Sequence, residues 1–173
     1  MRGVMAAKAI GSRTCRGFAL AGLAVLALGG CGTAPHSSSR QYDPPEQQAV
    51  SATRHHVVRA AAEQIGTPYH YGGNGHRGFD CSGLVQYAHR VAGIEVPRTT
   101  ADQWSVARTP GRRHLLPGDL LFFYIDQKKP SHVGIYEGHS VFIHAPSAGK
   151  AVSRASLDNP YWQQRLIGSK TFL

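Results

Sequence analysis

The sequence predicts an α+β fold in which helices come first and an antiparallel sheet follows them. Two segments with helical periodicity, near residues 57–65 and 81–92, precede every strand-like run. Beyond residue 117 the pattern changes to short apolar runs separated by turn residues, which is typical of strands. The chain has 173 residues, 42% of them hydrophobic and 17% charged, so we expect one domain with its own core.

The first thirty residues have the features of a targeting signal. Their basic start contains Arg2, Lys8, Arg13 and Arg16. An uncharged apolar run over residues 18–28 follows, which is too short to span a bilayer. It ends in Leu28-Gly29-Gly30-Cys31, which resembles the lipobox of bacterial lipoproteins, in which the cysteine is lipidated and becomes the first mature residue. An ordinary secretory signal is the alternative, since Gly29 and Gly30 also suit cleavage.

A polar stretch rich in proline, serine and glutamine follows Cys31 and predicts a flexible tether. The expected organisation is a lipoprotein signal peptide over 1–30, a tether over 31–52 and a globular domain over 53–173. Several acyl chains, palmitate among them, would give a stable membrane anchor. Gly32 stands where an aspartate would retain a lipoprotein in the inner membrane, so the resemblance implies the periplasmic side of a Gram-negative outer membrane.

Charge and cysteine content narrow the possible partners. Four of the 19 Lys and Arg residues and none of the 10 Asp and Glu residues lie in 1–30, so the remaining chain carries a net charge of +5. No run of five or six basic residues occurs, so we expect no nucleic-acid partner. Cys15 lies in the signal and Cys31 is expected to carry lipid. Cys81 is then a single thiol in an oxidising compartment, which suggests a chemical role.

The first predicted helix has one apolar face. That face contains Val57, Val58, Ala61, Ala62 and Ile65. Ser51 or Thr53 can cap its start, and Gly66 with Pro68 stops it. A glycine-rich loop follows, without the Gly-Lys-Ser/Thr ending of phosphate-binding loops.

We interpret Cys81 as a nucleophile in the first turn of a second helix. The apolar face of that helix contains Leu84, Val85, Ala88, Val91 and Ala92, and Gly93 closes it. Unpaired N–H groups and the positive end of the helix dipole favour a thiolate there. The alternative is a buried structural cysteine, because free cysteine is among the most buried residue types.

A short third helix and a set of strands complete the predicted domain. Thr100 and Gln103 have the spacing of a capping box, with Trp104 as the apolar anchor of this helix. The expected strands are 120–124, 133–136, 141–143, 151–152 and a last one from 165–167 to 171–173. The second and third flank turn residues 137–140 and predict a hairpin.

A nucleophilic cysteine needs a base, and the base needs a group that orients it. His132 and His144 are the candidates, because they lie at the ends of the two hairpin strands. If the strands pair about the turn, residues whose numbers sum to about 277 face each other, so these histidines, whose numbers sum to 276, should lie nearly opposite. The other histidines are expected on the surface: His36, His55, His56, His76, His89, His114 and His139.

Five motifs, in this order, resemble the signatures of the NlpC-type cell-wall cysteine peptidases. They are PYHYGG at 68–73, FDCSGL at 79–84, PGDL at 117–120, SHVGIY at 131–136 and FIHA at 142–145. The resemblance covers essentially the whole expected domain. It implies a papain-like fold, with N-terminal helices packed on a central antiparallel sheet, and cleavage of bacterial peptidoglycan peptides.

The resemblance also implies roles for single residues. Cys81 matches the nucleophile, His132 the base and His144 the residue that orients it. Tyr69 matches a tyrosine whose hydroxyl lies near the sulfur and helps to stabilise the oxyanion.

Two more matches concern substrate binding. Asp80 matches a residue implicated in holding the free amino group of the substrate, although an aspartate directly before a helix is also a good N-cap. Ser82 matches a substrate-contacting position; the alternative is that it lies in the first helical turn without contacting the substrate.

The cleaved bond and the type of activity each have alternatives. Many relatives that recognise a free N-terminal L-alanine carry SH3-like domains, and we expect none here, so the cleaved bond is either γ-D-glutamyl–diaminopimelate or D-alanyl–diaminopimelate. We expect a monomeric thiol hydrolase that needs no cofactor or metal. The alternatives are an inactive relative that only binds wall peptides, and a zinc site built from Cys81, His132 and His144.

Overall fold

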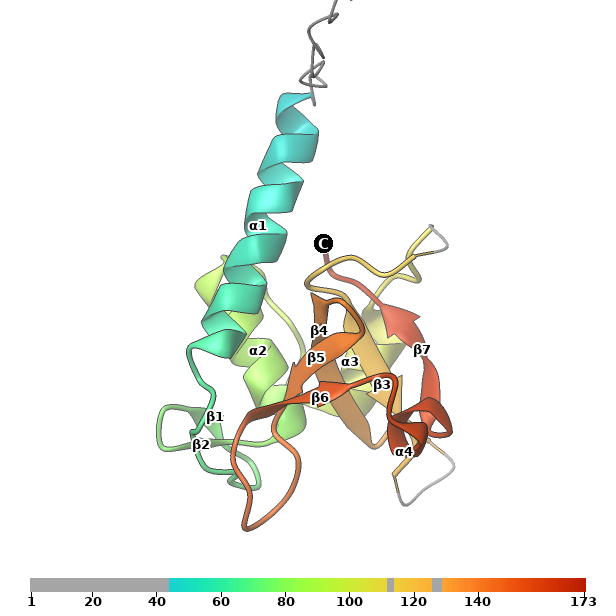
Figure 1. Ribbon diagram of the computed structural model, residues 1–173. Coiled ribbons are helices and arrows are strands. Elements are labelled where there is room, and N and C mark those ends of the chain that lie inside the picture. The colour runs from blue at the N-terminus through green and yellow to red at the C-terminus, as the bar shows by residue number, and fades with distance from the viewer. Residues whose placement is uncertain (1–43, 112–113, 126–128) are drawn as a thin grey trace, which may run out of the picture. The chain divides into compact units, whose positions relative to one another are not determined.

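The computed structural model describes residues 44–111, 114–125 and 129–173. A five-stranded antiparallel sheet has the order β6-β5-β4-β3-β7 (Figure 1). Its strands are β3 (Leu120–Phe123), β4 (His132–Gly138), β5 (Val141–His144), β6 (Ser153–Ser156) and β7 (Leu166–Lys170). The predicted α+β arrangement, with helices before an antiparallel sheet, is confirmed. The expected signal peptide, Cys31 and His36 lie outside the described residues.

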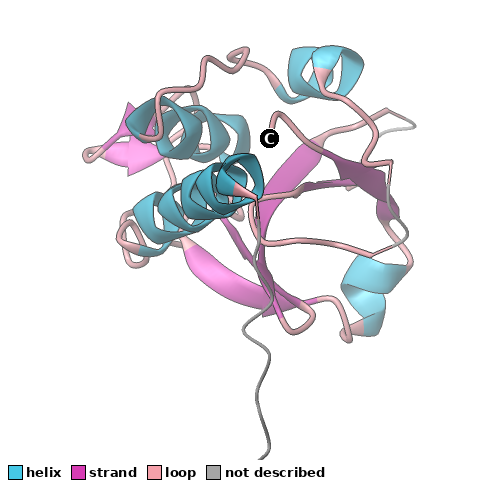
Figure 2. Cartoon of the chain, turned by 90° about the horizontal axis from the view of Figure 1, so that it is seen from above, coloured by secondary structure: helices cyan, strands magenta, loops and turns pink. Residues whose placement is uncertain are grey.

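The helices α1 (Pro45–Ala62) and α2 (Cys81–Val91) lie on the same side of the sheet (Figure 2). Their apolar residues, such as Val57 and Leu84, form the main core with residues of β3, β4 and β5. Within the described part of the chain, no helix is both long and apolar enough to cross a membrane.

Helix α1 begins eight residues before the expected start of the domain. We predicted a cap at Ser51 or Thr53 and a flexible tether up to residue 52, and this boundary is wrong. Pro44 is the N-cap residue and Pro45 is the first helical residue, where the missing N–H of proline costs no hydrogen bond. The hydroxyl of Thr53 instead donates to the carbonyl of Ala49 within the helix. Residues 44–50 are exposed, and their largely polar composition is the same as that of a flexible tether, so it did not reveal the helix.

The strand β3 is buried at all of its positions. Leu120 and Phe122 belong to the main core with α1 and α2, whereas Leu121 and Phe123 belong to a smaller apolar cluster that includes Phe142. This alternation follows from the opposite directions of successive side chains in a strand. A central strand covered on both faces explains the continuous apolar run in the sequence.

The predicted hairpin of β4 and β5 is confirmed. Ile135 pairs with Ile143, and Gly138 pairs with Val141 next to the turn. His139 and Ser140 form the two-residue loop with positive φ values of 49° and 61°, as tight hairpin turns require. The residue numbers sum to 278 for Ile135 with Ile143 and for Tyr136 with Phe142, and to 279 beyond an irregularity, for Gly138 with Val141, instead of the predicted 277.

Several shorter elements differ from the prediction. The hairpin of β1 (Asn74–Gly75) and β2 (Gly78–Phe79) and the helix α4 (Pro160–Gln163) were not expected. The strand expected at 151–152 is wrong, because Ala151 makes only an isolated bridge with Pro68 and β6 starts at residue 153.

The helix α3 (Thr100–Val106) is capped one residue earlier than predicted. The hydroxyl of Thr99 accepts a hydrogen bond from the N–H of Asp102, so a capping box of Thr100 and Gln103 is wrong. Gln103 is fully buried instead, and its amide donates to the carbonyls of Ser82 and Pro97. It thereby fixes α3 against the start of α2.

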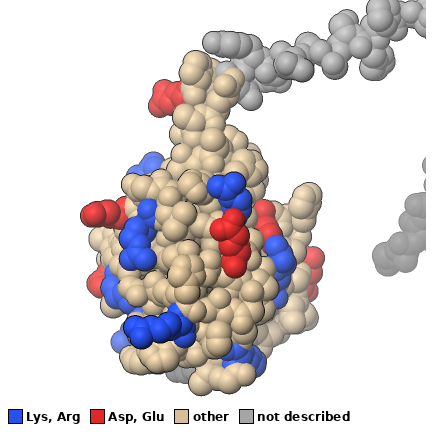
Figure 3. All heavy atoms as spheres, turned by 90° about the vertical axis from the view of Figure 1, so that its left-hand side faces the viewer, with Lys and Arg blue, Asp and Glu red and all other residues tan. Residues whose placement is uncertain are grey.

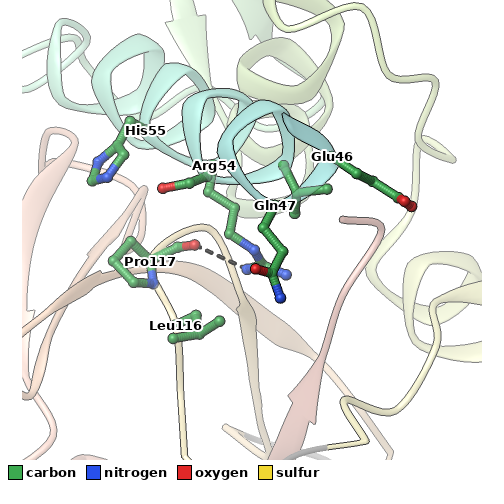
Figure 4. A pocket seen from close by; sticks show the side chains of 8 residues that line it. Glu46, Gln47, Arg54, His55, Leu116 and Pro117 are labelled. Atoms are coloured by element: carbon green, nitrogen blue, oxygen red, sulfur yellow. Dashed lines mark hydrogen bonds between the residues drawn. The ribbon is translucent and has the colours of Figure 1, made fainter. Parts of the chain in front are cut away.

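A buried ion pair joins α1 to the turn before β3. Nη1 of Arg54 lies 2.9 Å from Oδ1 of Asp119. The same nitrogen lies 3.0 Å from the carbonyl oxygen of Pro117 (Figure 4). The second carboxylate oxygen of Asp119 accepts from the N–H of Leu116 at 2.9 Å. The motif at 117–120 therefore has a structural role, because removing either charge would leave the other buried without its partner.

The charges on the surface are mixed. Figure 3 shows one face on which Lys and Arg side chains are scattered among Asp and Glu side chains and form no single large basic patch. This distribution agrees with the modest net charge of +5 that the sequence gives beyond residue 30.

Candidate active site

Cys81 is the first residue of α2, as predicted, and its thiol is free. Asp80 is the N-cap, and its side chain accepts from the N–H of Gly83 at 2.7 Å. The sulfur lies 3.5 Å from the hydroxyl oxygen of Thr100 and interacts with the backbone of Val133. The nucleophile candidate therefore lies where α2, the start of α3 and β4 meet.

A glycine allows the neighbouring loop to approach this helix start. A Cβ atom at Gly83 would collide with the carbonyl oxygen of Gly73. The absence of a side chain at Gly83 therefore lets the glycine-rich loop pack against the first turn of α2, and the N–H of Asp80 donates to that carbonyl at 3.0 Å. This contact fixes the position of the loop beside Cys81.

The predicted preference of Cys81 for a thiolate is wrong for the resting protein. Burial of the sulfur raises the pKa of the Cys81 thiol, and the hydrogen bonds from Thr100 and from the backbone of Val133 only partly offset this. Desolvation of the charged form outweighs the position at a helix N-terminus. The thiol is therefore protonated near neutral pH and needs a base to become a nucleophile.

The two candidate histidines meet in the structure. Nε2 of His132, the first residue of β4, lies 2.8 Å from Nδ1 of His144, the last residue of β5. With the observed register extended by one pair, His144 faces Gly134, and His132 is its diagonal neighbour on the same face. The predicted proximity is confirmed, although the two residues are diagonal rather than directly opposite.

Both histidines are neutral at neutral pH. Burial, together with the charge of His144, lowers the pKa of His132 to about 3, and burial, together with the charge of Lys150, lowers the pKa of His144 to about 4. A hydrogen bond between two neutral imidazoles carries one proton. When Nε2 of His132 holds this proton, Nδ1 of His132 has a free lone pair and can accept a proton from a thiol.

Aromatic rings hold the His132 ring in place. Trp162 of α4 stacks on it with a centroid distance of 5.6 Å and an interplanar angle of 24°, and it meets His144 edge-on at 5.0 Å. Trp162 was not predicted as part of the site. Its signal was Asn159-Pro160, because Asn is a good N-cap and Pro a good first helical residue, and Asn159 does accept from the N–H of Tyr161.

Tyr69 lines the same cavity as Cys81. Burial, and next the negative charge that Cys81 carries when ionised, raises the pKa of the Tyr69 hydroxyl, so the hydroxyl keeps its proton and can donate a hydrogen bond. Its N–H donates to the carbonyl of Lys150 at 2.8 Å, which ties this residue to the loop after β5.

Asp80 and Ser82 are held by Arg98, which the sequence analysis did not assign to the site. Arg98 binds the carboxylate of Asp80 with both terminal nitrogens, at 2.9 and 2.6 Å, and also donates to the hydroxyl of Ser82 at 3.0 Å. Asp80 further accepts from the N–H groups of Gly72 and Gly83. These contacts neutralise the carboxylate, and its binding of a substrate amino group stays a prediction, as does the substrate contact of Ser82.

The Cys81 cavity, defined here as the hollow lined by Cys81 and its neighbours, has a volume of about 410 Å³. Its walls include Tyr69, Asp80, Cys81, Ser82, Arg98 and Ser131. A hollow of about 580 Å³ between α1 and the turn at 116–117 shares none of these residues and is lined by no cysteine (Figure 4). The chemistry therefore points to the smaller Cys81 cavity.

Two further observations concern His89 and metal binding. His89 was expected on the surface but is fully buried, where its Nδ1 hydrogen-bonds the carbonyl of Val85 at 2.9 Å. Position 89 lies on the buried side of α2, one helical turn after Val85. The predicted buried face contained only apolar residues and therefore left His89 out. Within residues 44–111, 114–125 and 129–173, no group of three His, Cys, Asp or Glu side chains is arranged to hold a metal ion.

Comparison with known proteins gives consistent results. Residues 66–171 match the model of the NlpC/P60 family. A protein of Escherichia coli K12 named "Probable endopeptidase NlpC" is 39% identical over 85% of this chain and 94% of its own length. The murein DD-endopeptidase MepH of the same organism is 40% identical over 62% of this chain, which spans only 42% of MepH.

A solved structure supports the fold. The NlpC/P60 domain of the peptidoglycan hydrolase SagA is 31% identical and aligns with a TM-score of 0.60 over 69% of this chain and 98% of that domain. The papain-like α+β fold implied by the sequence motifs is confirmed.

Proposed function

This chain belongs to the NlpC/P60 family, and we propose that it is a cysteine endopeptidase that cleaves the peptides of bacterial peptidoglycan. Relatives named as endopeptidases, including the murein DD-endopeptidase MepH and the "Probable peptidoglycan endopeptidase LytE" of Bacillus subtilis, support this activity. The observation that carries the proposal is the hydrogen-bonded pair of neutral histidines, His132 and His144, in which His132 directly precedes Val133, whose backbone contacts the sulfur of Cys81.

The reaction begins with a proton transfer. Nδ1 of His132 takes the thiol proton of Cys81, while its Nε2–H donates to His144, which fixes the tautomer. The thiolate sulfur forms a bond to the carbonyl carbon of the peptide, and the electron pair of the carbonyl double bond moves to the oxygen. The Tyr69 hydroxyl is protonated and lines this cavity, so it is suited to donate a hydrogen bond to that oxyanion.

The intermediate then collapses to a thioester. The bond between the carbonyl carbon and the amide nitrogen breaks, and the His132 imidazolium gives its proton to the departing amine. Water then attacks the thioester with the neutral His132 as base, which releases the carboxylic acid and restores the thiol. Two different amide bonds are compatible with these steps, namely γ-D-glutamyl–diaminopimelate and D-alanyl–diaminopimelate.

The place of action is part of the proposal. We infer that the protein is anchored through lipidated Cys31 and faces the periplasm from the outer membrane, because the motif around Cys31 resembles a lipobox. Its working form is proposed to be a monomer that needs no metal.

Digestion of purified peptidoglycan, followed by mass spectrometry of the released fragments, tests this function. The protein should release peptides with a new amine on diaminopimelate, and the masses identify the bond. The Cys81→Ala variant should release none. Retention of the protein on peptidoglycan without any new fragment would instead favour a binding protein.

A further inference from the structure

A second cavity is lined by the candidate base, His132. This cavity, called the His132 cavity here, has a volume of about 370 Å³. Its walls include His132, Pro146, Ser147, Lys150, Tyr161 and Trp162. It shares no lining residue with the Cys81 cavity.

Two consecutive residues of the chain line the two cavities. Ser131 lines the Cys81 cavity, and the next residue, His132, lines the second cavity. The two cavities therefore adjoin where residue 131 is followed by residue 132. A peptide that crosses this point can place one half in each cavity.

The chemistry decides which half lies where. The carbonyl carbon must reach the sulfur of Cys81, so the acyl half belongs in the Cys81 cavity. The departing amine must receive its proton from His132, so the leaving half belongs on the side that His132 lines. The His132 cavity is therefore suited to the amino acid that carries the departing amine.

Lys150 supplies the charge of this cavity. The backbone of Lys150 is fixed, because its N–H donates to Ser147 at 3.1 Å and its carbonyl accepts from Tyr69 at 2.8 Å. No residue that lines the cavity is an Asp or Glu, and within the described residues no carboxylate forms an ion pair with Lys150. Lys150 is exposed and lines the cavity together with the aromatic residues Tyr161 and Trp162, and no carboxylate of the lining offsets its charge.

We propose that the His132 cavity binds the leaving amino acid and that Lys150 recognises a carboxylate next to the departing amine. This inference rests on the proposed peptidase function. Diaminopimelate, which supplies the amine in both candidate bonds, has a carboxyl group next to each of its amino groups. Lys150 then makes cleavage most efficient where that carboxyl group is free and ionised, because a charge-assisted hydrogen bond is stronger than a neutral one.

Binding to an inactive variant tests the site without any need for turnover. The full chain carrying Cys81→Ala is titrated with meso-diaminopimelate and with its diamide, and the two indole N–H signals are followed by NMR. Trp162 lines the cavity and Trp104 does not, so only the Trp162 signal should move. Lys150→Met should weaken diaminopimelate binding about tenfold and leave diamide binding unchanged.

A matched control removes an equal charge elsewhere. Lys170 lies over the ring of Trp104 at 4.7 Å and lines neither cavity. Lys170→Met should bind diaminopimelate as the parent does. The proposal is overturned if the Trp162 signal does not respond, or if Lys150→Met and Lys170→Met bind equally well.

Turnover gives a second, separable test. The active protein is given two peptides that differ only in a carboxylate or a carboxamide next to the scissile amide nitrogen. The ratio of kcat/KM between them should be about ten in favour of the carboxylate, and Lys150→Met should bring it near one. If neither peptide is cut, the proposed function fails, whereas the NMR titration still decides whether the cavity binds the amino acid.

Discussion

Mild acid should destabilise this protein through three buried histidines. Burial lowers the pKa of His132 to about 3 and those of His144 and His89 to about 4, whereas histidines of the unfolded chain titrate near 6.5. Above pH 6.5 these side chains are neutral in both states and do not affect the pH dependence. Below pH 6.5 the unfolded chain binds protons that the folded protein excludes, so the free energy of unfolding falls until the folded pKa values are reached.

The size of the effect follows from these values. Each histidine should lower the free energy of unfolding by about 1.4 kcal/mol per pH unit between pH 6.5 and roughly pH 4. At pH 5 this amounts to about 2 kcal/mol for each histidine and about 6 kcal/mol for the three together. A domain typically has a total stability of about 5–15 kcal/mol, so a large part of it would be lost.

Urea unfolding at pH 7.5, 6 and 5, followed by circular dichroism, measures this loss. His89→Gln removes one titrating group away from the Cys81 cavity, and the glutamine amide can still donate to the carbonyl of Val85. This variant should lose about 2 kcal/mol less than the wild type between pH 7.5 and 5. His55→Gln, an exposed position on α1, should lose as much as the wild type. An unchanged wild-type stability between pH 7.5 and 5, or an equal loss in His89→Gln, would refute the reasoning.

Four further predictions concern activity and location. Cys81→Ala should abolish hydrolysis and change the free energy of unfolding by only about 1 kcal/mol, because it removes one small side chain and no disulfide; wild-type turnover would exclude the mechanism. Thiol alkylation should stop hydrolysis while EDTA leaves it intact, and the reverse pattern would favour zinc. His144→Asn should keep measurable turnover of a muropeptide, because its amide oxygen can accept from Nε2 of His132. His144→Ala should lose about 10- to 100-fold more, and His132→Asn should approach the Cys81→Ala background; an active His132→Asn with an inactive His144→Asn would reverse the two roles. Cys31→Ser should move the protein from the membrane fraction to the soluble periplasm, and a variant that stays with the membrane would count against lipidation.

Elements with strong local signals could be predicted from the sequence. Asp80 as N-cap, Cys81 in the first turn of α2 and the tight turn before Val141 each depend on residues within a few positions of one another. Elements with competing local signals could not be placed correctly. Thr99 and Thr100 are chemically equal capping residues, and the backbone turn rather than the residue type selects Thr99. For the start of α1, Pro45 as a first helical residue is as good a signal as Ser51 as an N-cap.

The contacts that complete the site come from distant parts of the chain and had no periodic signal. Arg98 reaches Asp80 across 18 positions, and Trp162 stacks on His132 from a separate helix. The positions of such residues depend on how the sheet and helices pack, so the residue pattern within one segment does not predict that they belong to the site. The pairing of His132 with His144 was accessible because one hairpin register connects them.

The state of Cys81 shows how a local rule can lose to packing. A helix N-terminus stabilises a nearby negative charge by about 0.3–1 kcal/mol when exposed, whereas transfer of a charged group into a protein interior can cost several kcal/mol. Burial therefore decides the protonation of the thiol. The nearby histidines are buried too and remain neutral, so the resting site holds a thiol and an imidazole rather than an ion pair. In the proposed mechanism, charge separation then coincides with substrate binding, and it depends on the tautomer that the hydrogen bond between His132 and His144 selects.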